Sequence, residues 1–118
     1  MLRIGSIVTH CHEFDRTVTF WRHALGYEPR EPARGGWVVL RDPARRGPNL
    51  SFQARDEPRS RRSWVHLDLY ADNASAEVER LLTLGATRYP WRYPKVADYT
   101  VLADPDGNLF CVVERGGG

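Results

Sequence analysis

Apolar and polar residues alternate at the start of the chain, as they do in a strand with one buried face. Ile4 to Cys11 follows this pattern, and Trp64 to Ala71 repeats it about 60 residues later. Two further apolar segments, Asn49 to Ala54 and Asn108 to Glu114, stand at matching places in the two halves. The pattern therefore predicts strands that recur in the same order in each half.

Apolar residues spaced three or four apart follow each of the two first strands, and a glycine ends each run. They are Val18, Trp21, Leu25 and Gly26 in the first half, and Val78, Leu81, Leu82 and Gly85 in the second. This spacing predicts two helices, since glycine is favoured where a helix ends in left-handed backbone. The polar residues that could cap their N-termini are Glu13 or Asp15 for the first, and Asp72, Asn73 or Ser75 for the second.

Each half also contains a strand that ends in Asp-Pro. Val39 to Pro43 in the first half corresponds to Val101 to Pro105 in the second. The second of these strands runs into Asp104 to Asn108, where proline and glycine favour a tight hairpin. A strand, a helix and two or three further strands therefore occur twice.

This repeat predicts an α+β fold of two βαβββ modules within a single domain of residues 1–118. We expect the first module at about 2–56, a polar linker at about 56–63 and the second module at about 64–115. Each module would form a curved mixed sheet with its helix on one face. The opposite faces would then enclose a shared concave site.

Composition narrows the class of protein further. The 118 residues carry a net charge of +2, and the densest run of arginines, Arg55 to Arg62, is interrupted by acidic residues and proline, which favours a solvated linker over a nucleic-acid patch. The N-terminus lacks the pattern of a signal peptide, and the apolar runs are too short for a membrane span. We therefore expect a cytoplasmic protein without a nucleic-acid or membrane partner, in which Cys11 and Cys111 are free thiols.

Candidate chemistry lies on the first strand of the second half. Val65, Leu67 and Leu69 would share one face, while His66, Asp68 and Tyr70 would share the other. These polar side chains would either line the concave site or simply face solvent. On the first strand of the chain, His10 and His12 could bind a metal together, although histidines exposed in a loop are the preferred interpretation. No nucleophile elbow, P-loop or dinucleotide fingerprint is present in the sequence.

Three motifs together resemble the glyoxalase and bleomycin-resistance-like (vicinal oxygen chelate) superfamily, especially its short glyoxalase-like members. They are Phe20-Trp21 followed by Ala24-Leu25-Gly26-Tyr27, the strand start His66-Leu67-Asp68-Leu69-Tyr70, and the turn Asp104-Pro105-Asp106-Gly107-Asn108. The resemblance extends over residues 2–115. It implies paired βαβββ modules, a homodimer, and often a divalent metal held by the first and last strands of each module.

Only some of the metal ligands that this resemblance implies are present in this sequence. His66 matches the first-strand ligand of the second module, whereas Ser6 stands at the equivalent place in the first. The last-strand position falls on Cys111 in the second module and on Phe52 or Gln53 in the first. Glu114 lies on the opposite face by strand parity. We therefore predict no cofactor and a protein without the usual metal centre.

Two functions remain open on this basis. The first is proton-transfer chemistry of the lyase or isomerase type on a small organic molecule, with His66 as the general acid or base, because histidine exchanges protons near neutral pH. The predicted substrate contacts are Ser6, Trp37, Gln53, Asp68, Tyr70, Trp91, Tyr99 and Cys111. The alternative, which the resemblance to bleomycin-resistance proteins suggests, is a dimer that sequesters an antibiotic or metabolite unchanged.

Overall fold

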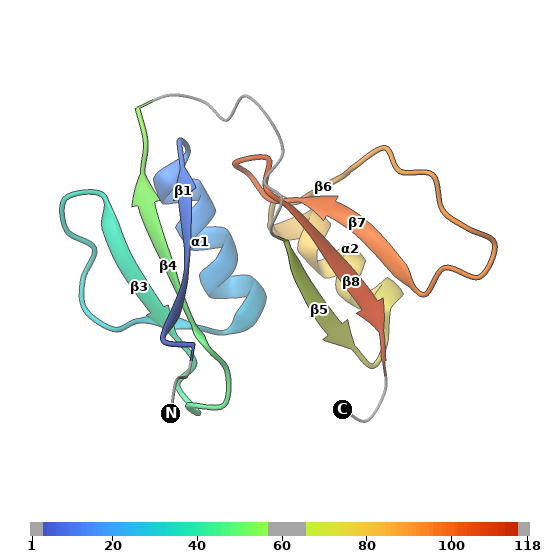
Figure 1. Ribbon diagram of the computed structural model, residues 1–118, viewed down its shortest axis with the longest axis horizontal. Helices are drawn as coiled ribbons and strands as arrows, with labels where there is room; N and C mark the ends of the chain where they lie inside the picture. The colour runs from blue at the N-terminus through green and yellow to red at the C-terminus, as the bar shows by residue number, and fades with distance from the viewer. Residues whose placement is uncertain (1–3, 57–65, 116–118) are drawn as a thin grey trace. The chain divides into compact units, whose positions relative to one another are not determined.

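The chain divides into two compact units, residues 1–59 and 60–118, which are described here one at a time. The computed structural model describes residues 4–56 and 66–115. The predicted linker residues 57–63 lie outside this range, as do Trp64 and Val65 of the predicted strand. Each unit contains the expected strand, helix and three further strands (Figure 1).

The first unit is a four-stranded mixed sheet in the order β1-β4-β3-β2. Its elements are β1 Ser6–Cys11, α1 Phe14–Leu25, β2 Glu28–Pro29, β3 Trp37–Arg41 and β4 Asn49–Ala54. β1 and β4 are parallel, whereas β3 runs antiparallel to both of its neighbours. This unit confirms the predicted α+β architecture for the first half of the chain.

The second unit has the same topology, with the strand order β5-β8-β7-β6. Its elements are β5 Leu67–Ala71, α2 Ala74–Leu84, β6 Thr87–Arg88, β7 Tyr99–Ala103 and β8 Leu109–Glu114. β5 pairs in parallel with β8, and β7 and β8 form the hairpin that Asp104 to Asn108 predicted. Gly107 has a φ of 85° in that turn, a conformation that favours glycine.

The pairing of first and last strands settles the register that the sequence left open. Val8 lies opposite Ser51 in the first unit, and Asp68 lies opposite Cys111 in the second. Ser51 is therefore the counterpart of Cys111, and the assignment to Phe52 or Gln53 was wrong by one or two residues. The loop between β3 and β4 is longer than the turn between β7 and β8, so counting along the chain gave the wrong position.

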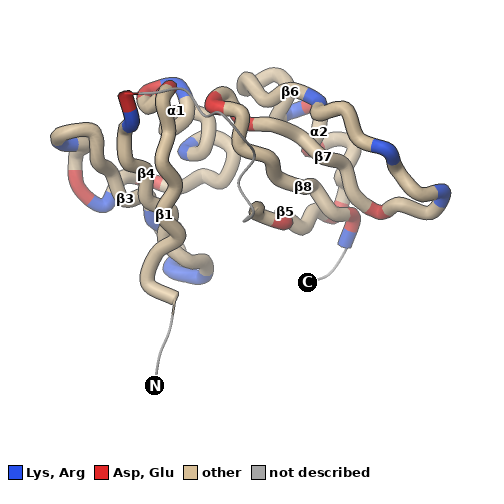
Figure 2. Tube along the Cα trace, turned by 45° about the horizontal axis from the view of Figure 1, so that its top comes forward, with Lys and Arg blue, Asp and Glu red and all other residues tan. Residues whose placement is uncertain are grey.

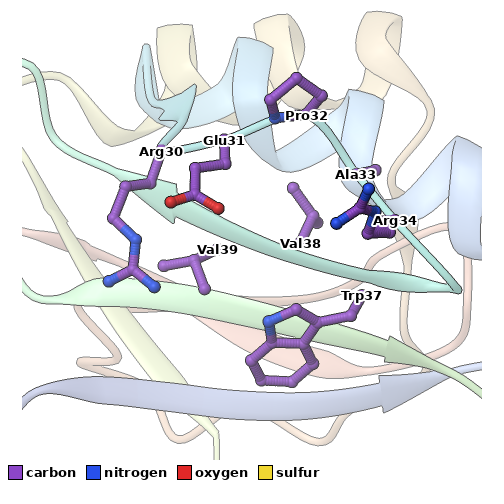
Figure 3. A pocket seen from close by; sticks show the side chains of 8 residues that line it. All are labelled: Arg30, Glu31, Pro32, Ala33, Arg34, Trp37, Val38 and Val39. Carbon is purple, nitrogen blue, oxygen red and sulfur yellow. The ribbon is translucent and has the colours of Figure 1, made fainter.

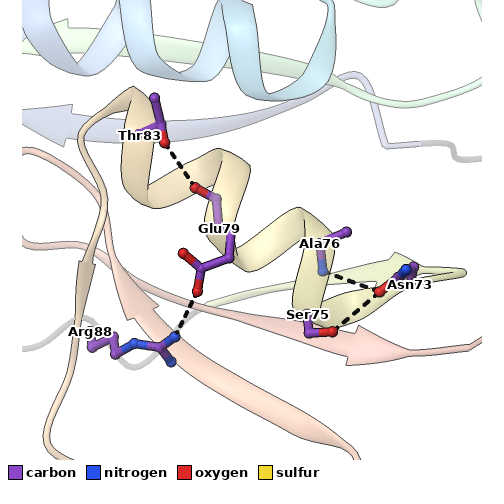
Figure 4. Close-up of polar contacts among 6 residues, drawn as sticks. All are labelled: Asn73, Ser75, Ala76, Glu79, Thr83 and Arg88. Carbon is purple, nitrogen blue, oxygen red and sulfur yellow. Dashed lines mark hydrogen bonds and ion pairs between the residues drawn. The ribbon is translucent and has the colours of Figure 1, made fainter.

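The two helices begin differently. The Asn73 side chain accepts a hydrogen bond from the backbone N–H of Ala76 at 3.1 Å, so the predicted cap of α2 is confirmed (Figure 4). Glu13 holds the corresponding place before α1, but its side chain makes no capping hydrogen bond. Its carboxylate lies 3.7 Å from the Arg16 guanidinium instead. Both helices end at the predicted glycines, Gly26 with φ 68° and Gly85 with φ 122°.

Apolar side chains from each helix and from one face of each sheet form the cores. Phe20, Trp21, Leu40 and Phe52 are buried in the first unit, and Val78, Leu81, Leu102, Phe110 and Val112 in the second. Burial of each such side chain stabilises the fold by about 1.5–3 kcal/mol relative to exposure. The helix therefore covers one sheet face in each unit, which leaves the other face available for a site (Figure 1).

The surface carries both signs of charge. Acidic and basic residues are interspersed along the described parts of both units (Figure 2). Neither described helix combines the length and apolar character that crossing a bilayer requires.

An aspartate organises the Asp-Pro turn of each unit. Asp104 is almost fully buried, and its Oδ1 accepts hydrogen bonds from the backbone N–H groups of Asp106 and Asn108 at 2.9 and 2.8 Å. Asp42 accepts three such bonds at 2.9 to 3.1 Å from the backbone of residues 44, 46 and 47. These backbone hydrogen bonds, that of Ala44 first, hold the pKa of the Asp42 carboxyl below its usual value.

We expect Asp104→Ala to lower the free energy of unfolding by about 2–4 kcal/mol, because a buried N–H that loses its acceptor costs about 1–3 kcal/mol. Urea denaturation followed by circular dichroism measures this change. Asp42→Ala is the matched control at the equivalent, more exposed turn, and it should cost less. Equal losses from the two variants would contradict the assigned importance of burial at Asp104.

Candidate functional site

A pocket of about 280 Å³ lies on the face of the second sheet that α2 does not cover. It is lined by His66, Asp68, Tyr70, Asp98, Tyr99, Cys111, Val113 and Arg115. Side chains alternate between the faces of a strand, so β5 and β8 each direct every second residue to this side. The pocket is close to the lower end of ordinary ligand pockets, about 300 Å³, and is suited to a small molecule.

His66, Asp68 and Cys111 lie close together in this pocket. His66 Nε2 lies 3.2 Å from Asp68 Oδ1, and about half of each of these two side chains is exposed. Asp68 and Cys111 are direct neighbours on the parallel strands β5 and β8. One ligand atom from each of the three side chains lies within 4.8 Å of the other two. The pattern of alternation predicted the face of His66 and Asp68, and the family resemblance had placed Cys111 at the last-strand position of the same module.

Cys111 is a thiol that holds its proton strongly. Burial, followed by the charge of Asp68 and a hydrogen bond to it, raises the pKa of the Cys111 thiol above its usual value. A thiolate is the nucleophilic form of cysteine, so this environment lowers the reactivity of Cys111. Both Cys111 and Cys11 are free cysteines, as predicted.

Aromatic residues lie beside the pocket. Trp91 Nε1 donates a hydrogen bond to the Tyr99 hydroxyl at 3.2 Å, and the rings of Tyr93 and Tyr99 are 5.6 Å apart. The Arg115 guanidinium stands 5.2 Å from the centre of the Tyr70 ring. Tyr70, Trp91 and Tyr99, which the sequence predicted as ligand contacts, are thus brought to the same side of the sheet. Arg115 and Asp98 were missed, although Arg115 follows Val113 by two residues and shares its strand parity.

The predicted contacts of the first unit have other surroundings. The Ser6 and Ser51 hydroxyls share a hydrogen bond of 2.6 Å, and Gln53 Nε2 donates one to the Gly36 carbonyl at 3.1 Å. Trp37 lies opposite Gln53 on the neighbouring strand. These residues belong to the first unit, whereas the residues that line the His66 pocket within the described part of the second unit are those given above.

Trp37 borders a cavity of its own, of about 570 Å³, beside the loop that joins β2 and β3. Figure 3 shows the Trp37 indole and the Val39 side chain on β3, with Arg30 and Arg34 contributed by the preceding loop. The two arginines, the Glu31 carboxylate and the indole give this cavity a mixed charged and aromatic character.

The other candidate ligands are held elsewhere. His12 Nδ1 lies 3.3 Å from the Arg55 carbonyl oxygen, and the Glu114 carboxylate accepts a hydrogen bond from Ala74 N–H at 2.6 Å, at the start of α2. Glu114 therefore faces away from the pocket, as its strand parity predicted. Within residues 4–56 and 66–115, the one group of three or more histidine, cysteine, aspartate or glutamate side chains placed to hold a metal is His66, Asp68 and Cys111.

The glyoxalase-like domain family matches residues 6–113, which is most of the chain. The chain belongs to this family. The match agrees with the superfamily that the sequence motifs resembled. A search of curated proteins found no match.

Several solved structures share the fold. A glyoxalase-related enzyme from Fulvimarina pelagi is 16% identical with a TM-score of 0.71, over 96% of this chain and 88% of that one. A glyoxalase/bleomycin resistance protein/dioxygenase family enzyme from Burkholderia phytofirmans is 17% identical with a TM-score of 0.71, over 94% and 97%. The fosfomycin resistance protein FosX of Listeria monocytogenes, complexed with Mn(II) and 1S,2S-dihydroxypropylphosphonic acid, is 16% identical with a TM-score of 0.77, over 97% and 90%.

A divalent metal held mainly by oxygen ligands does not fit the residues at the positions that the superfamily implies. Ser6 and Ser51 supply two neutral hydroxyls that bond to each other, and His66 and Cys111 supply an imidazole and a thiol. None of the four is a carboxylate, whereas Mn²⁺ and Mg²⁺ favour carboxylate and other oxygen ligands. We therefore derive no chemical step through such a metal.

The effect of Asp68 on the pKa of the Cys111 thiol can be tested directly. We expect Asp68→Asn to lower the pKa of Cys111, because it removes the negative charge that opposes ionisation. The rate of alkylation by iodoacetamide should therefore rise at pH 7, and its increase with pH should begin at a lower pH than in the unmodified chain. Mass spectrometry of the peptides measures the extent of alkylation at each cysteine, and buried Cys11 is the internal control. An unchanged rate at Cys111 would show that Asp68 does not affect this thiol.

Proposed function

We propose that the chain acts on a small polar organic molecule in the second-unit pocket, and that His66 transfers a proton to or from it. The observation that carries this proposal is the 3.2 Å contact between His66 Nε2 and Asp68 Oδ1 inside that pocket. A histidine oriented by a carboxylate is a recurrent arrangement for proton transfer. The reaction would be of the lyase or isomerase type and would need no metal.

The contact with Asp68 assigns a role to each ring nitrogen. A carboxylate accepts hydrogen bonds, so the Nε2 that faces Asp68 carries the proton in the neutral ring. The lone pair then lies on Nδ1, which is the atom that would accept a proton from the substrate. Asp68 would stabilise the imidazolium that forms and keep the ring in this tautomer.

The rest of the pocket suits a polar substrate. Arg115 supplies a positive charge that would attract an anionic group of the substrate, and Asp98 supplies a negative charge. The Tyr99 hydroxyl lies on the same face as Cys111 and Val113, where it could donate to a substrate oxygen. Ser6, Trp37 and Gln53 of the first unit remain predicted contacts. We also propose, from the family resemblance, a homodimer that works in the cytoplasm.

Sequestration of a small molecule is the second candidate function. About half of the His66 and Asp68 side chains is exposed. A site so open to water gains less from electrostatic stabilisation of a reacting group than an enclosed one. A protein that only binds its ligand does not need that enclosure. The similarity of fold to a fosfomycin resistance protein agrees with a resistance role.

Exchange of carbon-bound hydrogen with D₂O tests the catalytic proposal. We expect the chelator-treated protein to bind members of a panel of small 2-oxo acids and hydroxy aldehydes, and to exchange the hydrogen next to the carbonyl of at least one of them. Loss of a general base typically costs about 10²–10⁴-fold, so His66→Ala should reduce exchange by that amount. Proton NMR measures binding and exchange in the same sample.

His23→Ala is the matched control, because His23 is an exposed histidine on α1 outside the pocket. It should leave exchange unchanged. Binding without exchange, with the compound recovered intact, would support sequestration instead. Exchange that survives His66→Ala would show that another group transfers the proton.

A further inference from the structure

Three side chains of different chemistry converge on the open face of the second sheet. His66 offers an imidazole, Asp68 a carboxylate and Cys111 a thiol, and one ligand atom of each lies within 4.8 Å of the others. We propose that these three side chains bind Zn²⁺ or a similar thiophilic divalent cation within the second unit alone. This ligand set differs from the oxygen-rich one that the superfamily implies.

The backbone places the three ligands before any metal arrives. Asp68 and Cys111 are opposite each other on hydrogen-bonded strands, and His66 precedes Asp68 by two residues on the same face. β8 is paired on both sides, with β5 and with β7, so the Cys111 backbone lies inside the sheet and not at its edge. Asp68 and Cys111 thus lie on paired strands, which hold a site more firmly than loops do, and His66 stands directly before β5.

The distances suit a tetrahedral ion. Bonds of about 2.0–2.3 Å to nitrogen, oxygen and sulfur place tetrahedral ligands roughly 3.3–3.6 Å apart. His66 Nε2 and Asp68 Oδ1 are already 3.2 Å apart. All three ligand atoms lie within 4.8 Å of one another. To reach the tetrahedral separation they would have to approach each other by about 1 Å or slightly more, which rotation about side-chain torsions can supply. Three protein ligands also leave a fourth position for water or another small ligand, as in catalytic zinc sites.

The chemistry of the donors selects the metal. Thiolate and imidazole ligands favour Zn²⁺, whereas Mg²⁺ and Mn²⁺ favour oxygen. The carboxylate and the thiolate together carry two negative charges, which match the charge of the ion, and binding would release the thiol proton. The first unit offers an internal comparison, because Ser6, Val8 and Ser51 hold the corresponding strand positions and provide no such set.

Zinc binding can be tested separately from the proposed proton transfer. An ion at this site would occupy a ring nitrogen of His66, so it would compete with the substrate for that residue. The two proposals fail separately, because metal binding is measured without any organic ligand and hydrogen exchange is measured without metal.

The test uses the full chain after removal of metal by chelation. Isothermal titration calorimetry should give one Zn²⁺ per chain and no binding of Mg²⁺ at the same concentrations. Co²⁺ as a spectroscopic probe should produce the sulfur-to-cobalt charge-transfer absorption in the near ultraviolet. Cys111→Ser should abolish this absorption and weaken Zn²⁺ binding at least tenfold, the lower end of the roughly 10–100-fold loss caused by changing even a supporting group of a zinc site.

Cys11→Ser is the matched control, since it removes the other thiol and should leave the absorption intact. His66→Gln should weaken Zn²⁺ binding while the sulfur absorption persists at saturating Co²⁺. Thermal melts of the metal-free variants verify that each one is folded. Absence of stoichiometric Zn²⁺ binding, or an absorption that survives Cys111→Ser, would overturn the proposal. Mn²⁺ binding as tight as Zn²⁺ binding would overturn the selectivity.

Discussion

The parallel pairing of the first and last strands in each unit is the constraint on which the rest of the structure depends. Partners in this pairing are about 40 residues apart in the sequence, and the helix and two antiparallel strands lie between them. Once β5 and β8 are aligned, Phe110 and Val112 must face α2, and Cys111 must face the pocket. The same register therefore determines both the core and the chemistry of the open face.

Two units with one topology carry different chemistry on corresponding positions. Ser6 and Ser51 form a neutral hydroxyl pair where His66 and Cys111 join Asp68 in a cluster of titratable groups. Side chains on the open face have little to do with packing against the helix, so they can differ without disturbing the core. The glyoxalase-like fold accordingly fixes where a site can be built, while the residues at these few positions determine what it binds.

Much of the fold could be predicted because its signals are local. The glycines after α1 and α2, the Asp-Pro turns and the alternation in β5 each act within a few residues. The meeting of Asp68 with Cys111 could not be predicted in the same way, since it depends on a long-range parallel register that no hairpin sets. Phe52 and Gln53 were favoured over Ser51 because the loop between β3 and β4 is longer than the turn between β7 and β8. Arg115 was missed although its strand parity with Val113 is a local signal.

The buried aspartate of the β7–β8 turn has a consequence for the order of folding. The Asp104 carboxylate accepts hydrogen bonds from residues within four positions of itself, so the hairpin can close early, through contacts that cost little chain entropy. β5 must instead find β8 across an intervening helix and two strands, which is a slower, non-local step. We therefore expect the half of the pocket on β7 and β8 to form first, and the arrival of His66 and Asp68 to complete it.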